Sequence, residues 1–82
     1  MERKTLEELN NLIELEPNNA ALYIERASIY NYPLRQFDNA IEDLNKAVEL
    51  DPQNTDAYLH RAQTYQRDLN NAVVEAYNAR SQ

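Results

Sequence analysis

The feature that most constrains the fold is an internal repeat, in which two stretches of the chain match each other at an offset of 35 residues. Eleven of the 26 residue pairs that begin at Thr5 are identical at this offset. In the first stretch the identical residues are Glu7, Leu9, Asn10, Glu14, Leu15, Pro17, Asn19, Tyr23, Arg26, Ala27 and Tyr30. Beyond Tyr65 the offset falls to 32, so that Phe37, Ala40, Ile41, Leu44 and Ala47 correspond to Leu69, Ala72, Val73, Ala76 and Ala79. One structural unit therefore recurs, and the three missing residues are expected in a turn.

The segment from Phe37 to Pro52 shows the unit most clearly, because its apolar residues recur at three- and four-residue steps. Such spacing places them on one face of a helix that something else must cover. Asp38 is a suitable N-cap, and Pro52 cannot continue the helix. We expect this helix at about residues 38–50.

Similar signals predict five helices, all antiparallel to their neighbours because the connections are short. Thr5 and Glu8 form a capping box for the first helix, which Pro17 ends. Asn19 is the expected cap of the second, and Pro33 stops it near Asn31. The fourth helix is expected to begin near Asn54 and the fifth near Asp68, with no glycine anywhere in the chain to form hairpin turns.

Composition excludes several functional classes. The 82 residues include no cysteine and one histidine, which excludes a thiolate metal site and a disulfide framework. The net charge of −6 has no basic stripe within it, so nucleic acid is an unfavourable partner. No apolar run is long enough for a signal peptide or a membrane span, and we expect a soluble cytoplasmic protein with no membrane partner. No catalytic triad, phosphate loop or metal-ligand cluster is visible, so we expect no enzyme, metal or cofactor.

Two further patterns, Tyr-x-x-x-Ala-x-x-Tyr and then Phe-x-x-Ala-x-x-x-Leu-x-x-Ala-x-x-Leu-Asp-Pro, resemble the tetratricopeptide repeat family. The resemblance implies an all-α fold in which helical hairpins stack into a short right-handed superhelical solenoid. It divides the single domain, residues 1–82, into the second helix of a partial repeat at about 5–16, a full repeat at about 20–54 and a second repeat at about 55–82. Small alanines mark the helix crossings, and we expect tyrosines at 23, 30, 58 and 65 to pack between them.

The same resemblance implies a scaffold that binds a peptide in a shallow concave groove. The residues expected to line it are Ile24, Ser28, Asn31, Tyr32, Asp56, Leu59, Gln63, Gln66 and Arg67. Few of these are cationic, which favours a neutral or basic peptide with an apolar anchor. The alternative is an assembly element that self-associates weakly or caps a longer array through its open helical ends.

Two arginines at matching places in the repeat are expected to lean inward, where their charges need partners. We expect Arg26 to pair with Asp43, and Arg61 to pair with Glu75 or Asp43. These are expected to be structural ion pairs rather than part of the binding surface.

Overall fold

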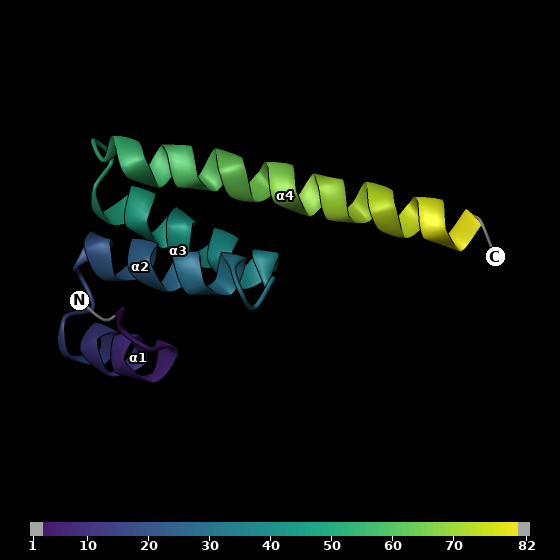
Figure 1. Ribbon diagram of the computed structural model, residues 1–82. Helices are drawn as coiled ribbons and strands as arrows, with labels where there is room; N and C mark the ends of the chain where they lie inside the picture. Colours follow the sequence, from purple (N-terminus) through teal and green to yellow (C-terminus); the bar gives the residue numbers. More distant parts are fainter. Residues whose placement is uncertain (1–2, 81–82) are drawn as a thin grey trace.

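The computed structural model describes residues 3–80, and all regular structure within them is helical (Figure 1). The helices are α1 (Leu6–Leu15), α2 (Ala20–Asn31), α3 (Phe37–Leu50) and α4 (Thr55–Arg80). Each helix packs on the next along the chain, and the end of α2 also contacts α4. The all-α class is thus confirmed for these residues, whereas the final residues 81–82 of the predicted second repeat lie outside the described part.

The first two helices begin where the sequence predicts. The Thr5 side chain accepts a hydrogen bond from the Glu8 N–H, and the Glu8 carboxylate accepts one from the Thr5 N–H, which completes a capping box. Asn19 Oδ1 accepts a hydrogen bond from the Ala21 N–H and caps α2. Both helix starts could be predicted from the sequence, because a capping side chain bonds to a backbone group no more than three residues away.

The start of α3 corrects one expectation. Asp38 lies in the first turn, and the N-cap is Gln36, which makes no side-chain capping bond. The preceding turn is shaped by Arg35, whose φ of 54° lies in the left-handed region that glycine favours. Arg35 is held there by its neighbours, since its guanidinium stacks on the Phe37 ring at 5.3 Å and Nη2 donates to Asn71 Oδ1 at 3.1 Å.

The largest correction concerns the predicted fourth and fifth helices, which are one continuous helix of 26 residues. No proline or glycine lies between Tyr65 and Leu69, and Gln66, Arg67 and Leu69 are good helix formers. Side-chain bonds from Gln66 to Asn70 and from Asn71 to Glu75 run along the helix through and beyond the predicted turn. Four helices therefore replace the predicted five in residues 3–80, and the turn expected from the change of offset does not form.

The core lies between α1, α2, α3 and the first part of α4. One cluster holds Leu9, Ile13, Leu22, Tyr23, Ala47 and Ala57. A second cluster, where α2 crosses α3, holds Ala27, Ala40 and Leu44. The small alanines let the helix backbones approach closely, and Leu44 fills the remaining space with no exposed surface.

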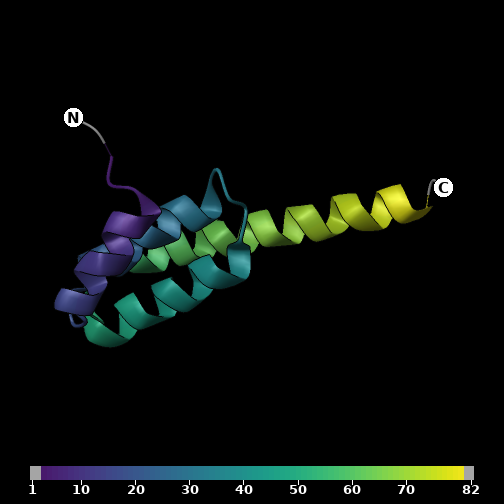
Figure 2. The ribbon, with the colours of Figure 1, turned by 90° about the horizontal axis from the view of Figure 1, so that it is seen from below.

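The second half of α4 projects away from this core, as Figure 2 shows. It gives the molecule its elongated dimensions of 48 × 26 × 22 Å. Beyond Asn71 every described residue is exposed, including Val73, Val74 and Tyr77.

The expected packing of the four tyrosines holds for two of them. Tyr23 is buried and Tyr30 half-buried as predicted, but Tyr58 and Tyr65 are 40% and 52% exposed.

Candidate functional site

A pocket of about 290 Å³ lies between the end of α2 and the middle of α4. Its lining residues are Arg3, Ser28, Asn31, Tyr32, His60, Gln63 and Arg67. The helical periods of the two elements explain the arrangement: Ser28 and Asn31 are one turn apart on α2, and His60, Gln63 and Arg67 follow three- and four-residue steps on α4. Each helix thus presents one polar stripe to the pocket.

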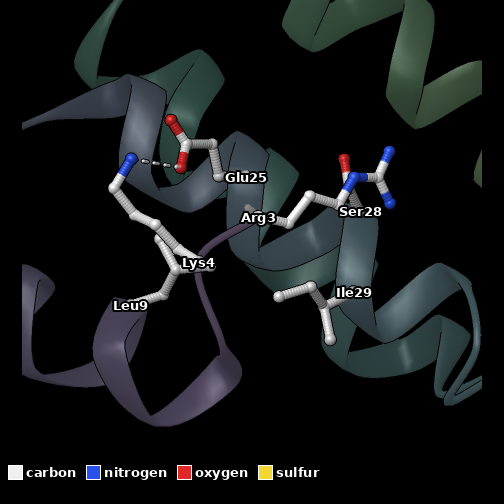
Figure 3. Close-up of a pocket in the computed structure, with 6 residues that line it drawn as sticks. All are labelled: Arg3, Lys4, Leu9, Glu25, Ser28 and Ile29. Carbon is white, nitrogen blue, oxygen red and sulfur yellow. Dashed lines mark hydrogen bonds and ion pairs between the residues drawn. The ribbon is translucent and has the colours of Figure 1, made fainter. Parts of the chain in front are cut away.

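A second pocket of about 260 Å³ lies on the other side of α2, beneath the segment that precedes α1. Figure 3 shows its lining residues, with the Arg3 side chain extending along α2 towards Ser28. Lys4 Nζ pairs with Glu25 at 3.3 Å at one end. Half-buried Ile29 supplies the apolar part of the surface, because Leu9 belongs to the core and is only 1% exposed.

The two pockets share Arg3 and Ser28 in their linings, so they are neighbours along α2. We call the two pockets together the groove. The end between α1 and α2 includes the apolar Ile29 beside charged groups, and we call it the apolar end; the end between α2 and α4 is the polar end. A surface of this kind can hold a short extended segment with an apolar side chain at one end and polar groups at the other.

The structure brings five of the nine predicted groove residues to the polar end: Ser28, Asn31, Tyr32, Gln63 and Arg67. The other four, Ile24, Asp56, Leu59 and Gln66, line neither pocket of the groove. Ile24 instead packs against both core clusters, and Leu59 is 53% exposed beside the groove stripe of α4. On α4, Gln63 and Arg67 of the predicted residues line the polar pocket, and His60 lies there as well.

Sequence reasoning missed several lining residues. His60 lies one turn before Gln63 on α4, so the helical period contained the signal for it. Arg3 and Lys4 precede the first helix, where no periodic pattern indicates which surface the chain will cover. Their place in the groove depends on the path by which this segment runs back over α2.

Asn31 is the most unusual polar group of the groove. The residue is only 6% exposed, and Oδ1 is buried with no hydrogen-bond partner within residues 3–80. A buried acceptor without a partner costs free energy of about 1–3 kcal/mol. Because Oδ1 is itself shielded from solvent, a donor in the groove reaches it only if the Asn31 side chain turns towards the pocket.

The groove is cationic although the chain as a whole is acidic. The ion pairs of residues 3–80 are Lys4–Glu25, Arg26–Asp43 and Lys46–Glu49. Arg3 and Arg67 therefore line the polar pocket without an ionic partner, and no carboxylate is among its lining residues. Charges beyond the Debye length of about 8 Å are largely screened, so these nearby arginines outweigh the distant net charge.

The Arg26–Asp43 pair lies outside the groove, between α2 and α3. Arg26 Nε and Nη2 donate to the two Asp43 carboxylate oxygens at 2.9 and 2.6 Å, and Nη1 donates to Asn10 Oδ1 at 3.0 Å. The guanidinium also lies 5.7 Å from the Tyr23 ring centroid and 5.8 Å from that of Tyr30. The hydrogen bond to Asp43 raises the pKa of Arg26, while burial opposes the shift. This pair joins the two helices of the hairpin.

Arg61 has a different environment from the expected one. Its Nη1 donates to Asn45 Oδ1 at 3.0 Å, and its guanidinium stacks on Tyr58 at 5.4 Å. Asp43 is engaged by Arg26, and Glu75 accepts from Asn71 on its own helix. Because α4 is continuous, Arg61 and Glu75 are separated by about 21 Å along one helix axis and cannot meet within the chain.

One segment of the chain matches a known family. Residues 34–68 match a family model described as a TPR repeat, which confirms the resemblance over α3, the first half of α4 and the turns before them. A repeat of this family is in general a protein–protein interaction module. Searches among curated proteins and among solved structures each found no match.

No group of three or more His, Cys, Asp or Glu side chains within residues 3–80 is placed to hold a metal ion. No helix of the same residues is long and apolar enough to cross a membrane.

Proposed function

We propose that the chain is a scaffold that binds an extended peptide of a protein partner in the groove. The observation that carries this proposal is the polar pocket between α2 and α4, whose lining offers hydroxyl, amide and guanidinium groups and no carboxylate. An extended peptide offers the backbone N–H and C=O groups that such side chains bind. No catalytic step is involved, since the groove groups bind and orient.

Neighbouring side chains supply further backbone contacts. Ser28 Oγ donates to the Ile24 carbonyl oxygen at 3.2 Å, so its lone pairs are directed outward as acceptors. Gln63 faces it from α4 and offers both a donor and an acceptor. Hydrogen bonds to the main chain hold an extended segment without selecting its sequence, so selectivity must come from the two ends of the groove.

At the apolar end, half-buried Ile29 offers a contact for one aliphatic side chain. At the polar end, Arg3 and Arg67 favour a carboxylate, which each guanidinium can hold through paired N–H bonds. The sequence alone favoured a neutral or basic peptide because it gave the groove Asp56 and only one cation. The pocket lining supports an acidic peptide with an apolar anchor instead, since Asp56 lines neither pocket and Arg3 joins Arg67.

Titration with matched peptides tests this proposal. Two peptides share one leucine and differ only in carrying two Glu or two Lys residues, and their binding is followed at low and high salt. We expect the acidic peptide to bind more tightly, with Kd of about micromolar or weaker because the groove is small. Arg67→Ala should weaken it roughly tenfold, whereas Arg80→Ala, which removes the same charge at the far end of α4, should not.

Equal affinity for the two peptides, or equal effects of Arg67→Ala and Arg80→Ala, would exclude the proposed anion contact. Gln63→Ala separates the backbone contact from the charge contact, because it removes an exposed amide that lines the pocket and should weaken both peptides by the same factor. The second candidate function, assembly through open helical ends, uses another surface of α4 and does not depend on the groove.

A further inference from the structure

An apolar stripe runs along the whole of α4 on a side that nothing in residues 3–80 covers. Its members alternate at steps of four and three residues: Tyr58, Ala62, Tyr65, Leu69, Ala72, Ala76 and Ala79. Every one of them is exposed, from 40% for Tyr58 to 59% for Leu69 among the large side chains. We call these seven residues the seam, because this spacing keeps them in line and is the pattern by which two helices pack along their length.

The seam lies on the side of α4 opposite the groove. Arg67 is nine residues from Tyr58, which is two and a half helical turns and places the two side chains about 180° apart. A helix packed on the seam would therefore leave the groove open.

The equivalent surface of α2 shows what such a stripe normally contacts. Tyr23 and Ala27, the repeat counterparts of Tyr58 and Ala62, are only 8% and 1% exposed. Ala27 is covered by Ala40 and Leu44 of α3. The residues with the sequence pattern of α3 are 69–79, but in α4 they continue the same helix and point away from the surface that they match.

Arg61 lacks one of the partners that its repeat counterpart Arg26 has. Arg26 and Arg61 make equivalent bonds to Asn10 and Asn45, which are themselves 35 residues apart. Arg26 makes two further bonds to the Asp43 carboxylate, and Arg61 has no carboxylate partner within residues 3–80. The repeat counterpart of Asp43 is Glu75, which is out of reach on the same helix.

We propose that two copies of this chain pair through α4 in antiparallel orientation, so that residues 69–79 of each copy cover residues 58–65 of the other. Residues 69–79 of each copy then pack on the first half of the other copy's α4 in the way that α3 packs on α2. Transferring the α2–α3 contacts gives Ala62 against Ala72 and Ala76 of the partner copy, and Arg61 against its Glu75. The midpoints of these pairs all fall between residues 67 and 69, so both ends can pair at once about one two-fold axis.

Side-chain size selects the antiparallel orientation. The large residues Tyr58 and Tyr65 are in the first half of the seam, and three alanines are in the second half. Antiparallel pairing packs tyrosine rings against alanines, whereas parallel pairing would bring like positions together and set Arg61 beside Arg61. The projecting half of α4 also leaves space for the partner, since no other helix lies beside it (Figures 1 and 2).

Charge reversal at the transferred ion pair tests the proposal by sedimentation velocity over a range of concentrations. The unmodified chain should dimerise with a Kd of about micromolar to 100 micromolar. Arg61→Glu or Glu75→Arg should each weaken the dimer by roughly tenfold or more, because two like-charged contacts form about the axis. Arg67→Glu makes the same change of charge on the other side of α4 and should leave the dimer intact.

Mixing the two single variants gives the sharpest result. In a mixed dimer of Arg61→Glu with Glu75→Arg, both contacts again join opposite charges, so two largely monomeric variants should dimerise only when mixed. The double variant R61E/E75R should also regain the dimer on its own. A monomer at about millimolar concentration would overturn the proposal, as would charge variants that leave the dimer unchanged. A double variant that regains stability but stays monomeric would show that the pair forms within one chain, which also overturns it.

Discussion

The α2–α3 hairpin and α4 are built from closely related sequences but differ in what surrounds them. In the hairpin, Tyr23, Ala27 and Leu44 are buried and Arg26 holds both oxygens of Asp43. In α4, the matching Tyr58, Ala62 and Arg61 lie on a surface with no covering helix. A repeat sequence therefore encodes a packing surface, while the turn after it decides whether the chain covers that surface itself.

The turns explain the difference. The hairpin has five residues between Asn31 and Phe37, including Pro33 and Arg35 with positive φ, which end one helix before the next begins. In α4 the corresponding stretch is three residues shorter by the change of offset and contains no helix-breaking residue. Helix propensity then continues the backbone, because nothing local opposes it.

The largest expected effect compares Leu44 with Leu69. Leu44→Ala removes a fully buried side chain at the α2–α3 crossing and should lower the free energy of unfolding by about 2–5 kcal/mol. Leu69→Ala removes an exposed one and should change it by less than about 0.5 kcal/mol, provided that the protein is too dilute to dimerise. Urea unfolding followed by circular dichroism measures both. A similar loss for the two variants would mean that Leu69 is packed within the monomer.

A smaller effect separates the two carboxylates at equivalent repeat positions. Asp43→Ala leaves the Arg26 guanidinium without an anion at a site where the Asp43 side chain is 5% and the Arg26 side chain 20% exposed, and should cost about 3 kcal/mol. Glu75→Ala should cost less than about 0.5 kcal/mol in the dilute monomer, because Glu75 is exposed and bonded only to Asn71 on its own helix. Thermal unfolding of both variants at low concentration checks this. If Asp43→Ala were as stable as the parent, the Arg26–Asp43 pair would not stabilise the hairpin.

Local signals predicted much of the fold. The capping box at Thr5, the cap at Asn19 and the stop at Asn31 before Pro33 all depend on residues within one turn of one another, so the sequence alone determines them. The cap at Asp38 failed because Asp38 lies within the helix, whose start is shifted one residue by the turn around Arg35. The predicted turn after Tyr65 failed because it was inferred from correspondence with the first repeat, while the local residues favour helix.

The groove was less predictable than the helices. Ser28 and Asn31 of α2, and Tyr32 after it, line the polar pocket as the resemblance implied. On α4 the lining includes the expected Gln63 and Arg67, together with His60, which the helical period could also have indicated. Arg3 could not be found from sequence, because it reaches the groove from a segment without regular structure.

A third comparison, with a smaller expected change in stability than the loss of Leu44 or of Asp43, gives α4 the turn that it lacks. Inserting a Gly-Asp-Gly tripeptide between Gln66 and Arg67 restores the length that the offset shows to be missing and interrupts the helix. Residues 69–79 should then fold back on Tyr58 and Tyr65, so that each chain forms its own hairpin and the intermolecular pairing is lost. The tyrosine burial gained is opposed by the entropy of ordering the projecting segment and of closing the turn, so the net change should be within about 1 kcal/mol.

Hydrogen exchange and sedimentation together detect this change. At concentrations where the parent is monomeric, amides beyond Asn71 should be protected only in the insertion variant, and at concentrations where the parent dimerises this variant should stay monomeric. An Ala-Ala-Ala insertion at the same site is the matched control. It has the same length but continues the helix, and three added residues rotate the second half of the seam by about 60° relative to the first. This control should therefore weaken the dimer without protecting the end of α4. If both insertions gave the same exchange pattern, the missing turn would not be what distinguishes α4 from the α2–α3 hairpin.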